Sequence, residues 1–276
     1  MRDPFLLDGP AVIAFSGGRT SGLMLHNIIR AHGGSLPDDV AVVFCNTGKE
    51  HNATLDFVEE CSQRWSVPIH WVEWREAEEP RDRWRVVTHA TASRNGEPFA
   101  AVIRRKSYLP NPVERFCTAE MKIQVTHRYI LRGLGWDAEY TKAVGLRADE
   151  SGRVARGRGR AQASKDPWLT SYPLFHAGIT VRDVVAFWRS QPFDLRLPLA
   201  PDGTTPQGNC DLCFLKGAGK LSSIIAAEPQ RAQWWADQEA AIGATFRNDR
   251  PSYAAMMQQM QLLPPDDDTP DCNCTY

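Results

Sequence analysis

The stretch "PAVIAFSGGRTSGLML" (residues 10–25) decides the fold, because an apolar run breaks into glycines and hydroxyls and then resumes with helical spacing. Residues 10–15 are short, apolar and β-branched, which predicts a buried strand. The next apolar positions predict a helix that stops at Gly33–Gly34: Leu23, Leu25, Ile28 and Ile29. A loop of this kind directs backbone N–H groups and the helix dipole at one spot, so it is typical of an anion site.

The following segments continue the alternation of strand and helix. We expect further strands at 39–48, 68–74 and 138–146 and helices at 52–65, 119–135 and 180–191. This order predicts an α/β fold, an open and mostly parallel sheet with helices on both faces. Such sheets bind ligands at the carboxyl ends of their strands, so "SGGRTS" and "CNTGKE" should lie at the same edge.

The rest of the chain is less regular. Residues 75–118 predict a long loop or small insertion, and the Gly- and Arg-rich residues 147–167 predict a mobile surface loop. Helices are expected at about 217–242 and at 251–262, before a Pro/Asp linker. We therefore divide the chain into an α/β domain over 1–200 and a helical C-terminal region over 201–276 that carries a cysteine metal site.

Composition limits the classes of function. A formal net charge of −1 gives no global attraction to nucleic acid or to membranes. No apolar run approaches the roughly 18 residues of a membrane span, and the N-terminus has no cleavage-site pattern. We expect a cytoplasmic protein without a membrane partner. In a reducing compartment its seven cysteines suggest metal binding or reactivity. Cys45 and Cys61, in apolar patterns, are interpreted as packing residues.

The loop motif carries the family resemblance. It is neither G-x-G-x-x-G nor a P-loop, but it matches S-G-G-x-x-S, the pyrophosphate loop of the adenine-nucleotide α-hydrolase superfamily. The alternative is a tight strand–helix turn. "NTGKEHNATLDFVEE", "GLRADESGR" and "SYPLFHAGITVRDVVAFW" then resemble, in order, segments of the phosphoadenosine phosphosulfate (PAPS) reductase family. The resemblance spans about residues 10–215 and makes 1–200 an adenine-nucleotide-binding domain.

The resemblance implies that an adenine nucleotide, ATP or PAPS/APS, lies on the pyrophosphate loop, with Mg²⁺ if it is ATP. The candidate nucleotide-binding residues are Ser16, Gly17, Gly18, Arg19, Thr20, Ser21, Asn46, Thr47, Gly48, Glu50, Gly145, Arg147, Glu150, Ser151 and Arg153. Attack at an α-phosphate needs cations for the spreading charge, so Arg147 is also a candidate catalytic residue. The arginines from Arg153 to Arg160 either close over a polyanion or form a solvated basic loop.

Five cysteines remain for chemistry. Cys210-x-x-Cys213 has the spacing of half a metal site, and Cys117 precedes a predicted helix whose N-terminus would lower a thiol pKa. In the adenylylsulfate reductase branch of the family, cysteines at similar places bind a [4Fe–4S] cluster. This chain has one cysteine, Cys117, where that branch has two. We therefore expect Cys117, Cys210 and Cys213 to hold a cluster whose fourth iron is open or bound by a tail cysteine, most simply Cys272, since thiolates suit iron–sulfur and zinc alike. The alternatives are a zinc site formed by Cys210, Cys213, Cys272 and Cys274 that ties down the tail, or free thiols.

The tail distinguishes the candidate functions. Sulfonucleotide reductases of the family end in E-C-G-x-H, with one nucleophilic cysteine, whereas this chain ends in "DCNCTY". The change favours ATP cleavage at the α-phosphate, coupled to sulfur transfer to a nucleobase, a nucleic acid or a small molecule. Cys117 or Cys274 would be the nucleophile, a cysteine desulfurase the sulfur donor, and a homodimer the assembly. The alternatives are reduction of PAPS/APS to sulfite with a thioredoxin-like reductant, and a non-catalytic nucleotide sensor with a zinc-tied tail.

Overall fold

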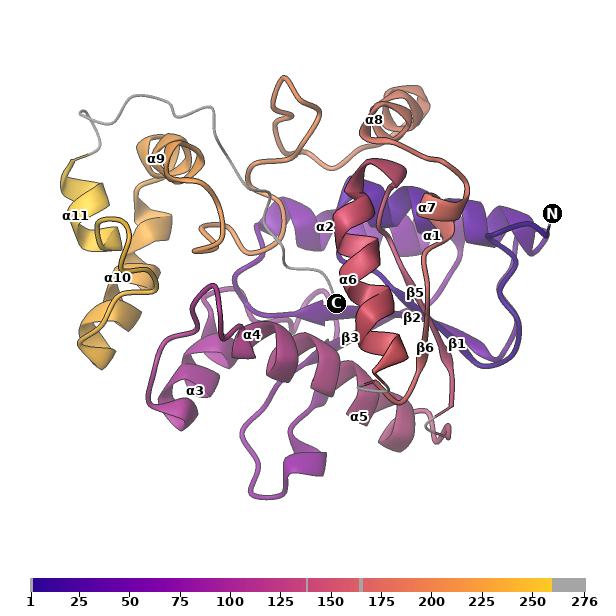
Figure 1. Ribbon diagram of the computed structural model, residues 1–276, viewed down its shortest axis with the longest axis horizontal. Coiled ribbons are helices and arrows are strands. Elements are labelled where there is room, and N and C mark those ends of the chain that lie inside the picture. Colours follow the sequence, from indigo (N-terminus) through magenta and orange to yellow (C-terminus); the bar gives the residue numbers. More distant parts are fainter. Residues whose placement is uncertain (1, 138, 164–165, 260–276) are drawn as a thin grey trace.

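A six-stranded sheet organises the part of the chain that this computed structural model describes, residues 2–137, 139–163 and 166–259 (Figure 1). The strand order is β4-β3-β2-β1-β5-β6, and only the β3–β4 pair is antiparallel among these. The strands are β1 (Ala11–Ala14), β2 (Val40–Asn46), β3 (Ile69–Glu73), β4 (Arg85–Val87), β5 (Thr141–Val144) and β6 (Leu169–Ser171). The predicted open, mostly parallel α/β sheet is confirmed.

The pleat of β2 shows how the two faces are buried. Val42 and Phe44 pack in a cluster with residues of α1 (Arg19–Ala31), α2 (Asn52–Trp65) and α8 (Val181–Ser190). Val43 and Cys45 point the other way, into a cluster with α3 (Glu97–Lys106) and α5 (Val125–Arg132). Alternate residues of a strand face opposite sides of a sheet, so a continuous apolar strand must be covered on both faces. Figure 1 shows these two helical layers.

Three further helices lie beyond the edge of the sheet: α9 (Ala218–Ala227), α10 (Gln230–Ile242) and α11 (Tyr253–Gln258) (Figure 1). Leu221 of α9 and Trp235 of α10 are fully buried in the same cluster as Val43. The expected helix over 217–242 is interrupted, because Pro229 precedes α10 and cannot donate a backbone hydrogen bond. The domain boundary at residue 200 stays a prediction, since the two parts share one apolar cluster.

The remaining described elements are short or connect the layers. They are η1 (Pro80–Asp82), α4 (Phe116–Thr118), the π-helical η2 (Ala119–Gln124), η3 (Ala148–Glu150), α6 (Ser151–Gln162) and α7 (Pro173–His176). The helix predicted at 119–135 is thus a rod over 116–132 with a π-helical segment in it. Within the described residues, none of the helices has the length and apolar character needed to cross a membrane.

Of the two alternatives for residues 75–118, a long loop is wrong and a small insertion fits, because the region contains β4 and α3. Phe99, Val102 and Ile103 give α3 a buried face. The mobile loop predicted over 147–167 is wrong, because that region contains the helix α6. Val154 anchors it in a small apolar cluster, and at Gly157 an added Cβ would lie 1.9 Å from the Tyr172 hydroxyl oxygen. That glycine lets the helix approach the chain beneath it, which outweighs its poor helix propensity.

Candidate functional site

The loop between β1 and α1 is folded tightly on itself. Gly17 has φ +74°, and a Cβ there would come 2.7 Å from Thr54 Cγ2, so the backbone needs glycine. The buried Ser21 hydroxyl binds the loop from within, since it accepts from the amides of Ser16 and Gly18 and donates to the Gly18 carbonyl. The first turn of α1 has no acidic residue. This turn therefore presents its amide groups and dipole to an anion.

A pocket opens above this loop and gathers most of the predicted nucleotide-binding residues. Those that line it are Ser16, Gly18, Arg19, Thr20, Ser21, Gly145, Arg147, Glu150 and Arg153. Gly145 fits close to the loop, because a Cβ there would be 3.4 Å from Ser21 Cα. Gly17 is turned beneath the loop instead, and the exposed Ser151 begins α6 outside the pocket lining.

Arg147 joins the pyrophosphate loop to the segment that follows β5. Its Nη1 donates to Thr20 Oγ1 at 3.2 Å, and its Nε donates to Asp149 at 3.0 Å. Glu150 accepts from the Arg147 amide and forms ion pairs with Arg147 and Arg153. The Arg153 Nη2 atom is buried without a hydrogen-bond partner among the described residues. Two guanidinium groups thus pair with two carboxylates, Asp149 and Glu150, at the pocket wall. Arg153 Nη2 is a donor there that an anion could use.

Arg19, a predicted nucleotide-binding residue, has its guanidinium bound by protein groups. Its guanidinium forms a two-point contact with Asp194, at 2.7 and 2.8 Å, and donates to Thr205 Oγ1 at 2.8 Å. The side chain is 6% exposed, and it also donates to the carbonyls of Leu195 and Leu197. Such a fork of donors is well suited to holding a carboxylate and nearby carbonyls. Arg19 therefore fixes the segment around residue 200 to the start of α1.

That segment supplies a wall of the pocket that the sequence analysis missed. The wall residues are Gly203, Thr204, Thr205, Pro206, Gly208, Asn209, Lys216 and Lys220. Lys216 is buried, and its Nζ donates to the carbonyls of Gly208 and Cys210. The glycines, hydroxyls and lysines of "GTTPQGN" and "KGAGK" were a usable signal. Their contact with the pyrophosphate loop could not be predicted from the sequence, because the partners are far apart in it, as Arg19 and Thr205 are at a separation of 186 positions.

The second predicted motif, "NTGKE", lies outside the lining of this pocket. Asn46 is fully buried, where its amide donates to Glu73 and to the Ser93 carbonyl. Its side-chain oxygen accepts from the amide of Gly48, whose φ is +77°. Glu50 accepts from the amide and hydroxyl of Thr47, which closes the turn. The motif therefore stabilises a turn at the sheet edge, and its described contacts are with protein.

Three of the predicted metal ligands do meet. Cys117, Cys210 and Cys213 line one small buried cavity, together with Thr47 and Lys122. Thr47 Oγ1 and Cys210 Sγ are 3.5 Å apart. Burial raises the pKa of Cys210 to about 12, and the nearby Glu50 carboxylate adds to that shift. The Thr118 hydroxyl, also at this cavity, has no hydrogen-bond partner among the described residues. Cys45 and Cys61 are buried elsewhere, as expected of packing residues.

The thiols fit a soft metal by their chemistry, and a cation would have to displace their protons. Across residues 2–137, 139–163 and 166–259, however, no group of three or more His, Cys, Asp or Glu side chains is arranged to hold a metal ion. Cys272 and Cys274 lie outside the described residues. The cavity therefore gathers three of the predicted ligands, but the described residues do not form the predicted cysteine metal site.

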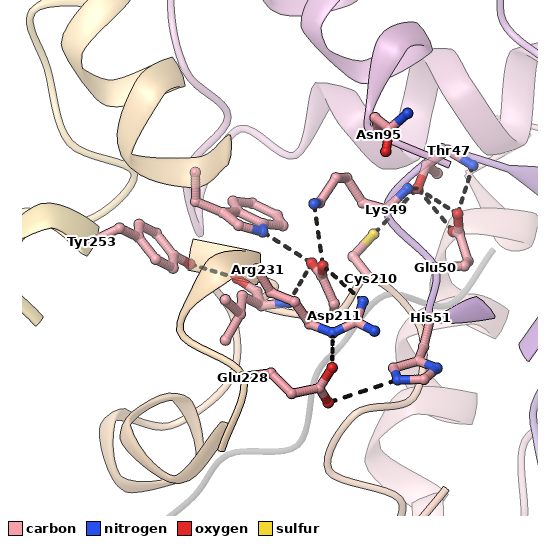
Figure 2. Close-up of polar contacts among 12 residues, drawn as sticks. Thr47, Lys49, Glu50, His51, Asn95, Cys210, Asp211, Glu228, Arg231 and Tyr253 are labelled. Atoms are coloured by element: carbon pink, nitrogen blue, oxygen red, sulfur yellow. Dashed lines mark hydrogen bonds and ion pairs between the residues drawn. The ribbon is translucent and has the colours of Figure 1, made fainter. Parts of the chain in front are cut away.

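A buried ion pair holds the C-x-x-C turn against the "NTGKE" motif (Figure 2). Lys49 Nζ lies 3.1 Å from Asp211 Oδ2, and both side chains are buried. Asp211 also accepts from Trp235 Nε1 at 2.9 Å, while its amide donates to the Lys49 carbonyl at 2.7 Å. A β-bridge pairs Glu50 with Cys210. These contacts fix Cys210 beside Thr47, so the two motifs form one unit.

The same network continues to the surface through α10 (Figure 2). Arg231 Nη1 lies 3.7 Å from Asp211 Oδ2, and its Nε donates to Glu228. Glu228 in turn lies 3.7 Å from His51 Nε2. Burial and the Arg231 charge lower the pKa of His51, so it is neutral at pH 7 and accepts from the Ala53 amide through Nδ1.

Comparison with known proteins agrees with this geometry. The family model for the phosphoadenosine phosphosulfate reductase domain matches residues 10–193. The chain is also similar to a protein of Escherichia phage lambda, "Uncharacterized nin region protein ORF290". The two are 28% identical over 215 residues, which cover 76% of this chain and 67% of the phage protein. The matched domain includes the pyrophosphate loop, Arg147 and Cys117, and ends before the C-x-x-C turn.

Proposed function

Because the chain belongs to the phosphoadenosine phosphosulfate reductase domain family, within the adenine-nucleotide α-hydrolase-like superfamily, we propose that it is an ATP-dependent sulfur-transfer enzyme. Members of the family are typically enzymes that act on nucleotides. One observation carries the proposal. The segment 208–216 takes part in both sites. Gly208, Asn209 and Lys216 line the pyrophosphate-loop pocket, and Cys210 and Cys213 line the thiol cavity. A site for nucleotide phosphates and a site for sulfur chemistry are thus built on one segment.

In this proposal the pyrophosphate loop binds the leaving group. The first-turn amides of α1 and the hydroxyls of Ser16 and Thr20 donate to the β- and γ-phosphates of ATP, which arrives with Mg²⁺. Arg147 neutralises charge that develops around the α-phosphorus. An oxygen of the acceptor attacks this phosphorus, the bond to pyrophosphate breaks, and the acceptor carries AMP. A sulfur at the oxidation level of hydrosulfide then displaces AMP, with no net redox change.

The thiol cavity supplies the sulfur side of the reaction. Cys117, Cys210 and Cys213 would hold three corners of a [4Fe–4S] cluster and Cys272 the fourth, with Cys274 left as a nucleophile; zinc on the same thiols is the alternative. If the fourth iron were left open instead of being ligated by Cys272, a bound cluster would provide an iron that binds sulfur. A cysteine desulfurase would deliver the sulfur as a persulfide, and two electrons from a thiol reductant would bring it to the level of hydrosulfide.

Product analysis tests the proposal. Anaerobically purified protein, incubated with ATP, Mg²⁺, a sulfide source and candidate nucleobase or nucleic-acid acceptors, should give AMP and pyrophosphate in equal amounts. Arg147→Ala should reduce both, whereas Arg189→Ala on the exposed face of α8 should not. The family match supports one other candidate, reduction of PAPS or APS. Release of sulfite from either compound with a thioredoxin-like reductant, without AMP from ATP, would replace the proposed function by that one.

A further inference from the structure

Helix α6 carries a feature that nucleotide binding does not require. Within Ser151–Gln162 it has four arginines and no acidic residue. Val154 is its one buried residue, and Gly152, Gly157 and Gly159 interrupt its sequence. A helical glycine costs about 1 kcal/mol relative to alanine, and like charges three or four residues apart repel. The arginines and glycines therefore lower the intrinsic stability of this helix.

Three of these arginines form a stripe that ends at the pocket. Arg153 lines the pocket, and Arg156 and Arg160 follow at i+3 and i+7, so helical periodicity places all three along one side. The stripe is about 10 Å long at the rise of an α-helix. That length corresponds to about three nucleotides at 3.4 Å each. Figure 1 shows α6 crossing in front of the sheet, so the helix is not enclosed between layers.

The three arginines of the stripe differ in how far their charges are already paired, and Arg153 has an ion pair with Glu150. Arg156 is exposed, and no ion pair or hydrogen bond of its side chain is found among the described residues. Arg160 pairs with Asp166 at 2.8 Å, where the arginine side chain is 54% exposed and the aspartate side chain 16%. The exposed part of the guanidinium can still be reached by a phosphate. The remaining arginine, Arg158, is held on α7 by His176 and the Phe175 ring. A row of phosphates can therefore compete for the stripe.

We propose that the stripe binds the phosphate backbone of a single-stranded nucleic acid, whose adjoining nucleotide enters the pocket as the sulfur acceptor. This inference rests on the proposed function and names its substrate class. A nucleic acid fits better than an acidic protein segment for two reasons. Its phosphates are spaced regularly along a line, as the arginines are, and its bases or phosphates offer the oxygen that attacks ATP. Neutralised arginines also no longer repel one another, so binding stabilises α6.

The test measures binding of a fluorescein-labelled, mixed-sequence 12-nucleotide DNA and RNA to the full chain by fluorescence anisotropy, between 50 and 200 mM salt. For single strands, the logarithm of the binding constant falls with the logarithm of the salt concentration by a slope of about 0.7 for each phosphate contact. Three contacts predict that affinity falls about 20-fold over this range. With two contacts left in Arg156→Ala, the same increase in salt should lower the affinity only about 7-fold. With one contact left in Arg156→Ala/Arg160→Ala, it should lower the affinity about 3-fold. Alanine has the higher helix propensity, so these variants keep α6.

Controls separate this inference from the proposed function. Arg132→Ala removes an exposed arginine at the end of α5 and should leave binding and its salt dependence unchanged. ATP binding by isothermal titration should be intact in both stripe variants. If the unmodified protein did not bind ATP, the proposed function would be refuted. ATP binding with oligonucleotide affinity that does not depend on Arg156 and Arg160 would overturn the inference alone. So would equal affinity for a poly-glutamate of the same charge, since that would indicate an acidic protein partner.

Discussion

Lys49 and Asp211 form a buried ion pair, Nζ to Oδ2 at 3.1 Å, between the "NTGKE" turn and the C-x-x-C turn. The two residues are 162 positions apart in the sequence, yet their backbones are also joined by the Asp211 amide and the Lys49 carbonyl. The pair therefore fixes the turn that carries Cys210 to the edge of the sheet.

Replacing either Lys49 or Asp211 should lower the free energy of unfolding substantially. Lys49→Met leaves a buried carboxylate without its ammonium partner, which typically destabilises a protein by about 3–5 kcal/mol. The double variant Lys49→Met/Asp211→Asn should cost less than the sum of the single variants, because neither charge remains buried alone. Urea unfolding of all four proteins measures this. Arg105→Ala, which breaks the exposed pair with Glu76, is the control and should cost under about 1 kcal/mol. Additive losses would show that the pair is not coupled.

The pyrophosphate loop should not tolerate a side chain at Gly17. Gly17→Ala combines a left-handed backbone conformation with a Cβ only 2.7 Å from Thr54 Cγ2 and 3.0 Å from Val58 Cγ2. Gly243→Ala has a similar φ of +71° but no atom within 4 Å of its Cβ, so it isolates the cost of the conformation, about 1 kcal/mol. We expect Gly17→Ala to lose several times more stability and to abolish ATP binding. Equal losses in the two variants would contradict the close packing beneath the loop.

Lys142 gives stability a pH dependence in the alkaline range. It lies inside the sheet with its Nζ 5.0 Å from the centre of the Trp168 ring, and burial lowers its pKa to about 8 from an ordinary 10.5. Between about pH 8 and 10.5 the unfolded chain binds more protons at this residue than the folded chain, so stability rises with pH there. Lys142→Met removes that rise and should stabilise the protein at pH 7, by about 1–3 kcal/mol. Parallel stability profiles of the two proteins would refute this.

Iron content tests the role of the thiol cavity. If Cys117, Cys210 and Cys213 bind a cluster, replacing any one by alanine should remove most of the iron and the absorbance near 400 nm from anaerobic protein. Cys61→Ala is the matched control, because Cys61 is equally buried but packs in the cluster on the opposite face of the sheet. Stoichiometric zinc without iron would contradict the cluster assignment.

The elements of the sheet could be predicted because their signals are local. An apolar run followed by "SGGRTS" specifies a strand, a turn and a helix within about 20 residues, and the structure has all three there. Helix α6 could not be predicted in this way. Its glycines and arginines are typical of a loop, and the contact of Gly157 with Tyr172 that permits the helix is tertiary.

The site was predictable in its parts but not in their arrangement. Ser16, Arg147 and Arg153 do line one pocket, whereas Asn46 and Glu50, assigned to the same cleft, are used to close a turn. Arg19 stands inside the motif, yet its partner Asp194 is 175 residues away, and no local pattern reveals that pairing. The wall formed by residues 203–220 was missed for the same reason.

Lys216 fixes the backbone that connects the pyrophosphate-loop pocket to the thiol cavity. Its buried ammonium group donates to the carbonyl of Gly208, at the pocket, and to that of Cys210, at the cavity. The backbone between these two residues is therefore held in one conformation. The pocket and the cavity thus share one stretch of backbone, with Gly208 in the lining of the first and Cys210 in the lining of the second, so a change in the position of either site is passed directly to the other.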